Sequence, residues 1–263
     1  MSYSHFLPFN ILAFVFGTVV GSFLNVVIYR LPAGKSIVRP PSSCPFCGTV
    51  IKPWHNIPLL SYIWLRGKCA NCGAVISPRY PLVELITGVF CLATFRRLGI
   101  QPIFFVEFTF ICLLIAITFI DLETMTIPDV LSLPGIPFAF LGSVLTGMLT
   151  WKASLIGLLA GGGSFWLLSF IYYIIRGKEG LGGGDVKLIA MIGAYTAWPG
   201  VLFTVLFASL VGSIVGIGMM FRKKEGLTTM LPFGPFLAMG ALCYLYWGPA
   251  FFRWYFSLGA PKY

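Results

Sequence analysis

Long runs of apolar residues, separated by short polar or glycine-rich stretches, recur along almost the whole chain. A helix of about 17–25 apolar residues is long enough to cross a bilayer. The pattern therefore predicts an all-α polytopic membrane protein with about eight transmembrane helices. The expected spans are 6–28, 80–95, 102–120, 130–149, 155–175, 186–197, 201–221 and 232–247, of which 80–95 and 186–197 are the shortest.

The composition agrees with a membrane protein. Of the 263 residues, 58% are hydrophobic and only 10% are charged, whereas soluble domains average about 25% charged residues. The net charge is +10, but the Lys and Arg residues lie between the apolar runs, as the positive-inside rule expects. We therefore expect a lipid bilayer and no nucleic acid as the partner. Residues 1–10 contain no basic residue, which argues against a removable signal peptide.

The one long polar segment, 30–79, contains no Asp or Glu. Its seven basic residues are Arg30, Lys35, Arg39, Lys52, Arg66, Lys68 and Arg79. This charge predicts a cytoplasmic loop between the first two transmembrane helices. We therefore divide the chain into a first transmembrane helix (1–29), a cytoplasmic loop (30–79) and a transmembrane bundle (80–263). With eight crossings, both termini would lie outside the cytoplasm.

The loop contains two CxxC motifs, Cys44/Cys47 and Cys69/Cys72, separated by 21 residues. Two such motifs supply four thiolates for a tetrahedral Zn²⁺ site. Two disulfides or a redox pair are the alternative, but they require an oxidising compartment. Four cysteines leave no open coordination position, so we expect a structural zinc ion rather than a catalytic one. His55, between the motifs, is expected to be a surface or packing residue.

Two aspartates lie at the ends of apolar runs, and the second belongs to the glycine-rich stretch 180–187. Asp121 ends one run, and Asp185 follows the glycines Gly182–Gly184. Asp185 could be an ordinary helix N-cap. Three glycines exceed what a cap requires, however, and allow close approach of an extended substrate. The helix N-terminus and Lys187 favour an ionised Asp185, while burial and a helix C-terminus favour a protonated Asp121. Such a pair can activate water and protonate a carbonyl oxygen.

Other carboxylates compete for these roles. Six of the eight acidic residues fall on the expected cytoplasmic side: Asp121, Glu123, Asp129, Glu179, Asp185 and Glu225. Asp129 follows a proline and precedes an apolar run, which is typical of a helix start, and Glu123 is expected to be solvated. Glu84 falls within a span, where an ionisable residue is costly. It could pair with Arg79, form a hydrogen bond within the bundle, or have a functional role.

With these motifs in hand, the chain resembles the type IV prepilin leader peptidases, bacterial members of the GxGD aspartic proteases. The resemblance covers almost the whole length. Its pieces are 21–32, the paired CxxC motifs, 79–84, Ile120-Asp121 with Ile127-Pro128-Asp129, 182–187 and 231–235.

The resemblance implies an aspartic endopeptidase with Asp121 and Asp185 as catalytic residues, supported by Gly182, Gly184 and Lys187 of the glycine loop. Its substrates would be prepilins and pseudopilins of type IV pilus and type II secretion systems. They would be cleaved after a glycine at the cytoplasmic face of the bacterial inner membrane. Relatives with the cysteine loop also methylate the new N-terminal residue with S-adenosylmethionine, for which the sequence indicates no binding residues.

Two other classes of function fit parts of the sequence. A proton-coupled transporter could use intramembrane acids and carry the zinc loop as a cytoplasmic cap, and a non-catalytic scaffold could use that loop to dock partners. Transporters often contain inverted repeats. This chain shows no clear internal repeat, and its acids cluster at one expected membrane edge. The sequence therefore favours the peptidase.

Overall fold

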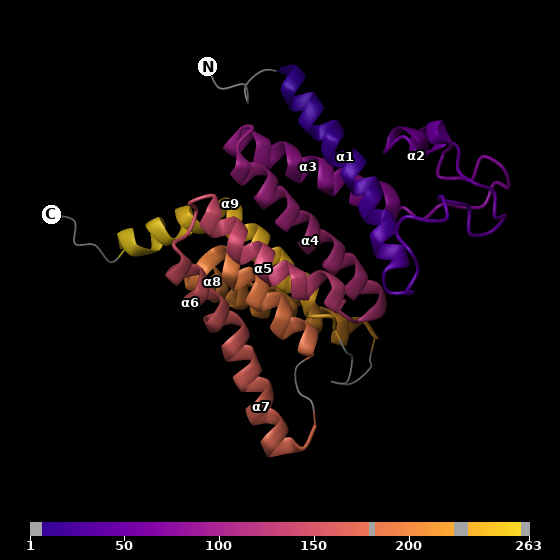
Figure 1. Cartoon of the computed structure of the whole chain (residues 1–263). Coiled ribbons are helices and arrows are strands. Elements are labelled where there is room, and N and C mark those ends of the chain that lie inside the picture. The colour runs from indigo at the N-terminus through magenta and orange to yellow at the C-terminus, as the bar shows by residue number, and fades with distance from the viewer. Residues whose placement is uncertain (1–6, 179–181, 224–230, 259–263) are drawn as a thin grey trace. The chain divides into compact units, whose positions relative to one another are not determined.

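The computed structural model describes residues 7–178, 182–223 and 231–258. The described residues form helices and no β-strand (Figure 1), which confirms the all-α prediction. The helices are α1 (Leu7–Arg30), η2 (Pro53–His55), α2 (Leu60–Trp64), α3 (Arg79–Leu98), α4 (Pro102–Thr124), α5 (Asp129–Leu145), α6 (Trp151–Leu158), η3 (Leu159–Gly163), α7 (Ser164–Arg176), α8 (Gly183–Lys223) and α9 (Gly234–Leu258). Glu179, Glu225 and the start of the stretch 180–187 lie outside the described residues.

Within the described residues, four helical stretches are long and apolar enough to cross a membrane. They are Leu7–Arg30, Pro102–Thr124, Trp151–Arg176 and Gly183–Met219. The chain is therefore a multi-pass membrane protein, whereas the figure of about eight spans stays a prediction. The two spans expected at 186–197 and 201–221 both lie within the residues labelled α8 (Gly183–Lys223). The helical backbone is interrupted at Ala197 (φ 58°, ψ −177°), just before the expected turn at 198–200.

The chain folds as two compact units, Met1–Ala116 and Ile117–Tyr263, and the boundary between them in the sequence falls within α4. In the first unit, α1 packs against α3 through small residues. A Cβ atom at Gly17 would come within 2.5 Å of the Cys91 Cβ, and one at Gly21 within 2.7 Å of the Glu84 Cα. Lipid provides no hydrophobic drive between helices, so close backbone contact must hold them together.

In the second unit, α8 is the central helix, with α5, α6, η3 and α9 packed against it. A Cβ atom at Gly161 of η3 would come within 2.5 Å of the Ile189 carbonyl oxygen. The Ser154 hydroxyl donates a hydrogen bond to the carbonyl of Ala194 (2.6 Å). Leu188 and Ile189 are fully buried. The start of α8 is thus held on several sides, and this fixes the position of Asp185.

Candidate active site

Asp121 lies in the last turn of α4 and is 4% exposed. Its Oδ2 accepts a hydrogen bond from the backbone amide of Gly234, the first residue of α9 (3.1 Å). A Cβ atom at Gly234 would stand 2.6 Å from the same oxygen. The absence of a side chain at Gly234 is therefore what lets the start of α9 approach this carboxylate.

Asp185 lies in the first turn of α8 and is half-buried. Its amide donates a hydrogen bond to the carbonyl of Gly182 (3.0 Å). Ile127 packs against the start of α8 and the start of α9. A Cβ atom at Gly184 would come within 2.7 Å of the Ile127 Cβ, and one at Gly234 within 3.2 Å of its Cδ1. The end of α4 and the starts of α8 and α9 therefore converge around one isoleucine.

This convergence brings Asp121 and Asp185 together within the second unit. The two carboxylates lie close enough for their charges to interact. Two neighbouring carboxylates titrate as a unit, because the charge on one makes ionisation of the other less favourable. Two such carboxyl groups can supply one ionised and one protonated partner, which is the combination that acid–base hydrolysis of a carbonyl group uses.

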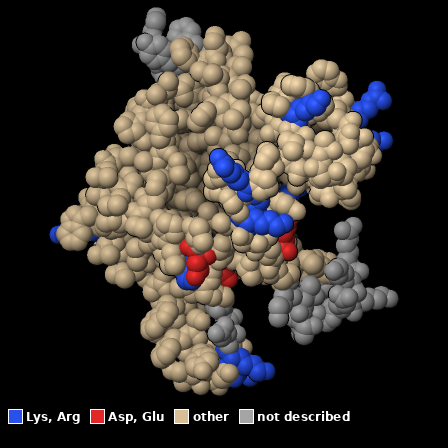
Figure 2. Space-filling model, turned by 45° about the vertical axis from the view of Figure 1, so that its right-hand side comes forward, with Lys and Arg blue, Asp and Glu red and all other residues tan. Residues whose placement is uncertain are grey.

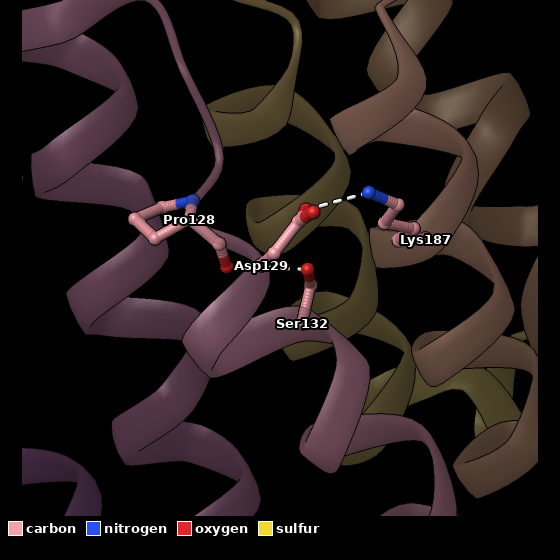
Figure 3. A network of polar contacts seen from close by, with 4 residues as sticks. All are labelled: Pro128, Asp129, Ser132 and Lys187. Atoms are coloured by element: carbon pink, nitrogen blue, oxygen red, sulfur yellow. Dashed lines mark hydrogen bonds and ion pairs between the residues drawn. The ribbon is translucent and has the colours of Figure 1, made fainter.

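Lys187 is two residues after Asp185. The sequence suggested that it would favour the charge on Asp185, but in the structure it lies against Asp129. Its Nζ forms an ion pair with Asp129 Oδ1 at 2.5 Å (Figure 3). Asp129 is the first residue of α5, in agreement with its predicted role as a helix start. The ion pair therefore ties the start of α5 to the start of α8. Glu123, the other competitor for the role of Asp121, is exposed.

Gly184→Ala is expected to lower peptidase activity about 100-fold, because a displacement of about 1 Å at a catalytic group can cost that much. The new methyl group would collide with Ile127 and shift the chain next to Asp185. The matched control is Gly183→Ala, since no atom lies within 4 Å of a Cβ at Gly183. Initial rates of cleavage would be compared. Equal losses in both variants would contradict this geometry.

Replacing Lys187 by Gln should have a small effect. Asp129 is more than half exposed, and exposed ion pairs contribute at most about 1 kcal/mol, so we expect cleavage to fall by about fivefold or less. Asp129→Asn should cost the same, and the double variant no more, because the three variants break one pair. Lys187→Arg should restore the rate. Multiplying losses in the double variant would show that the two residues act separately.

The four cysteines of the CxxC motifs form a second site, in the first unit. Their sulfur atoms all lie within 4.8 Å of one another, and Cys44 and Cys72 are 3.9 Å apart. A tetrahedral zinc ion with Zn–S bonds of about 2.3 Å requires sulfurs about 3.8 Å apart, so the four thiols fit this metal. A glycine with positive φ follows each motif directly: Gly48 (69°) after Cys47 and Gly73 (74°) after Cys72.

Hydrogen bonds favour the thiolate form of Cys47, the form that binds metal, whereas hydrogen bonds with the other three cysteines help to raise the pKa of Cys72 to about 11. The pKa of Cys47 is lowered from 9.0 to about 6, first by a hydrogen bond with the Thr49 side chain and then by one with its backbone. Asn71 contributes as well, with its Nδ2 3.7 Å from the Cys47 sulfur. His55 is not among the residues of this cluster, which is consistent with its expected role.

Sequence reasoning gave no role to Ile127 or Gly234. Both lie in motifs that carry the family resemblance, but nothing in the local pattern indicates that Gly234 contacts Asp121 or that Ile127 packs against the starts of α8 and α9. The one signal in the sequence was Gly234 itself. A glycine is not needed to begin a helix, so its place at the start of an apolar run could have indicated a close contact there. Glu84 also has a partner that the sequence did not suggest. Its Oε2 accepts a hydrogen bond from the amide of Leu59 (2.8 Å), in the polar loop.

The sequence of this chain matches known protein families. A sequence profile of the Type IV leader peptidase family matches residues 108–217, a range that contains both Asp121 and Asp185. A second profile, the Bacterial Peptidase A24 N-terminal domain, matches residues 15–98.

The chain belongs to the type IV leader peptidase family. A relative from Aeromonas hydrophila is 37% identical over 280 residues, 97% of each chain, and is named prepilin leader peptidase/N-methyltransferase. A relative from Pseudomonas aeruginosa with the same name is 36% identical, over 98% of this chain and 97% of its own. One from Myxococcus xanthus is 42% identical, over 81% of this chain and 63% of its own. No solved structure matches the chain.

Proposed function

We propose that this protein is a membrane aspartic endopeptidase that removes the leader from type IV prepilins and pseudopilins and then methylates the new N-terminal residue. The observation that supports the peptidase proposal is the convergence of the end of α4, which contains Asp121, with the starts of α8, which contains Asp185, and of α9. The names of relatives aligned over almost the full chain support both activities. They give no support to the transporter considered from the sequence.

The proposed chemistry uses the two carboxyl groups in opposite states. The ionised one takes a proton from a water molecule, whose oxygen attacks the carbonyl carbon of the scissile bond. The protonated one donates its proton to the carbonyl oxygen, giving a tetrahedral intermediate. When the C–N bond breaks, the leaving nitrogen takes a proton and becomes the new N-terminal amine. Methylation then forms an N–C bond while the methyl–sulfur bond of S-adenosylmethionine breaks and the amine loses a proton.

We place this reaction at the cytoplasmic face of the bacterial inner membrane. The basic loop 30–79 supports this orientation, because cytoplasmic loops carry an excess of Lys and Arg. Gly182 and Gly184 would let an extended peptide approach Asp185 closely. Cys44, Cys47, Cys69 and Cys72 would hold a structural zinc ion that orders the loop.

Co-expression with a prepilin tests the proposal. The wild-type chain should convert the prepilin to a faster-migrating form, and mass spectrometry of the product should show loss of the leader and addition of one methyl group. Asp121→Ala and Asp185→Ala should each abolish the conversion. Conversion by either variant would exclude the proposed pair, and a cleaved but unmethylated product would exclude the second activity.

A further inference from the structure

The short helix α2, in the polar loop, turns its apolar side chains outward. Leu60, Ile63 and Trp64 are 64%, 72% and 83% exposed, and their spacing puts them on one face of the helix. The polar residues between them are bonded back to the loop. Ser61 Oγ donates to the carbonyl of Ile57 (2.7 Å), and Tyr62 Oη donates to that of Ile76 (3.3 Å). A helix in water would have the opposite orientation.

The apolar surface extends beyond the helix itself. Trp54 and Ile57, which shortly precede α2, are 58% and 44% exposed, and we call the five exposed apolar residues Trp54, Ile57, Leu60, Ile63 and Trp64 the α2 face. Soluble proteins rarely expose a contiguous group of large apolar side chains unless it binds something. The α2 face therefore requires an apolar partner.

The position of the α2 face relative to α1 and α3 limits what its partner can be. The amide of Leu59, just before α2, donates a hydrogen bond to Glu84 Oε2. Glu84 is five residues into α3, or about 7.5 Å along its axis. Helical side chains lean toward the helix N-terminus, so Leu59 lies level with the first turns of α3. Gly21 of the membrane-spanning α1 packs against Glu84. Gly21 is nine residues before the end of α1, so the start of α2 lies level with the C-terminal half of α1 and the first turns of α3.

The charges next to the α2 face indicate an anionic partner. Lys52 Nζ lies 5.5 Å from the ring centroid of Trp54. Arg66 and Lys68, which follow α2, are both exposed. Basic side chains protrude from the loop on the face drawn in Figure 2, and the segment 30–79 contains no Asp or Glu to offset them. The partner must therefore combine an apolar phase with negative charge.

We propose that the α2 face lies in the interfacial layer of the bilayer, where Lys52, Arg66 and Lys68 bind anionic phospholipid headgroups. Tryptophan is enriched at this level of membrane proteins, and interfacial helices bury their apolar face about 5–10 Å into the headgroup boundary. Beside the C-terminal half of the membrane-spanning α1, the bilayer offers both an apolar phase and, at its surface, anionic headgroups. The cysteine site would then be held against the membrane surface rather than free in the cytosol.

Hydrogen–deuterium exchange on the full-length, zinc-loaded protein tests this. The protein would be placed in nanodiscs of phosphatidylcholine alone, in nanodiscs that also contain phosphatidylglycerol, and in detergent. Amides of residues 60–65 should exchange about tenfold more slowly in the anionic nanodiscs than in the neutral ones. The triple variant Lys52→Gln, Arg66→Gln, Lys68→Gln should lose this difference. Lys152→Gln, which removes an exposed Lys next to Trp151, should keep it.

Three results would overturn the proposal. Equal protection of residues 60–65 in detergent and in both kinds of nanodisc would mean that another part of the chain covers the α2 face. Protection that appears only after a prepilin is added would mean that the partner is a protein. A second variant, Ile63→Ser with Trp64→Ser, should lower protection in both lipid mixtures while the zinc content stays unchanged. A double variant that keeps its protection would likewise contradict a lipid-facing role.

Discussion

Replacing Asp121 or Asp185 by Asn is expected to lower the rate of prepilin cleavage by about 1,000-fold or more, since acid–base groups contribute factors of about 10²–10⁴. Asparagine keeps the size of the side chain but can neither take a proton from water nor give one to the carbonyl oxygen. At position 121 it can still accept the hydrogen bond from the Gly234 amide, so the helix ends should remain in place. Cleavage would be measured with purified protein in vesicles under single-turnover conditions.

Glu123→Gln is the matched control. Glu123 is also a carboxylate at the end of α4, but it is exposed and has no place in the proposed pair. Its loss should change the rate by no more than about twofold, as surface substitutions usually have small effects. A large loss in Glu123→Gln, or an Asp185→Asn variant that keeps a tenth of the wild-type rate, would assign the chemistry to other residues.

Loss of the metal is expected to unfold the cysteine loop. Structural zinc contributes about 10–16 kcal/mol to the folding of zinc-finger peptides, and the loop around Cys44 and Cys72 places few apolar side chains in a core. Cys72→Ser should therefore abolish zinc binding and make residues 30–79 sensitive to a protease that the wild-type loop resists. The measurements are elemental analysis of the purified protein and mass spectrometry of its proteolytic fragments.

Cys243→Ser provides the control for zinc binding. Cys243 is also a free thiol, but it lies in α9 and is not one of the four clustered cysteines. This variant should keep both its zinc and its resistance to proteolysis. A Cys72→Ser loop that stays resistant without metal would show that hydrogen bonds alone hold its fold.

Much of this architecture follows from local sequence. Apolar runs predict the helices, and the CxxC spacing predicts the cysteine cluster, because a CxxC turn brings its two sulfurs together within four residues. That Asp129 begins a helix follows from the proline before it. In each case the information lies within a few neighbouring residues.

Contacts between distant segments could not be predicted in this way. The ion pair of Lys187 with Asp129 joins residues 58 apart in sequence and depends on how α5 packs against α8. The placement of Gly234 beside Asp121 joins residues 113 apart. The position of Asp121 and Asp185 at the ends of apolar runs suggested that they form a pair, and the family resemblance implied the same, but no local pattern encodes the distance between them.

The number of membrane spans shows a different limit. Hydropathy indicates where apolar residues are, but it does not determine whether a short interruption reverses the chain. Trp198, Pro199 and Gly200 look like a turn between two spans. In the structure the helical backbone is interrupted at Ala197 (φ 58°), and a Cβ atom at Gly193 would come within 2.9 Å of the Val201 side chain, so the chain changes direction there. The conformation of a single residue decides this, and a pattern averaged over a span cannot resolve it.

In the proposed mechanism, Asp121 and Asp185 act as one unit on the scissile bond. The most direct test of this is the single-turnover cleavage rate of the double variant Asp121→Asn, Asp185→Asn beside the two single variants. Residues that act as a unit show strongly non-additive losses. We expect the cleavage rate of the double variant to be no lower than that of the slower single variant. A double variant whose loss is the product of the two single losses would contradict this mechanism, because the two carboxylates would then contribute independently.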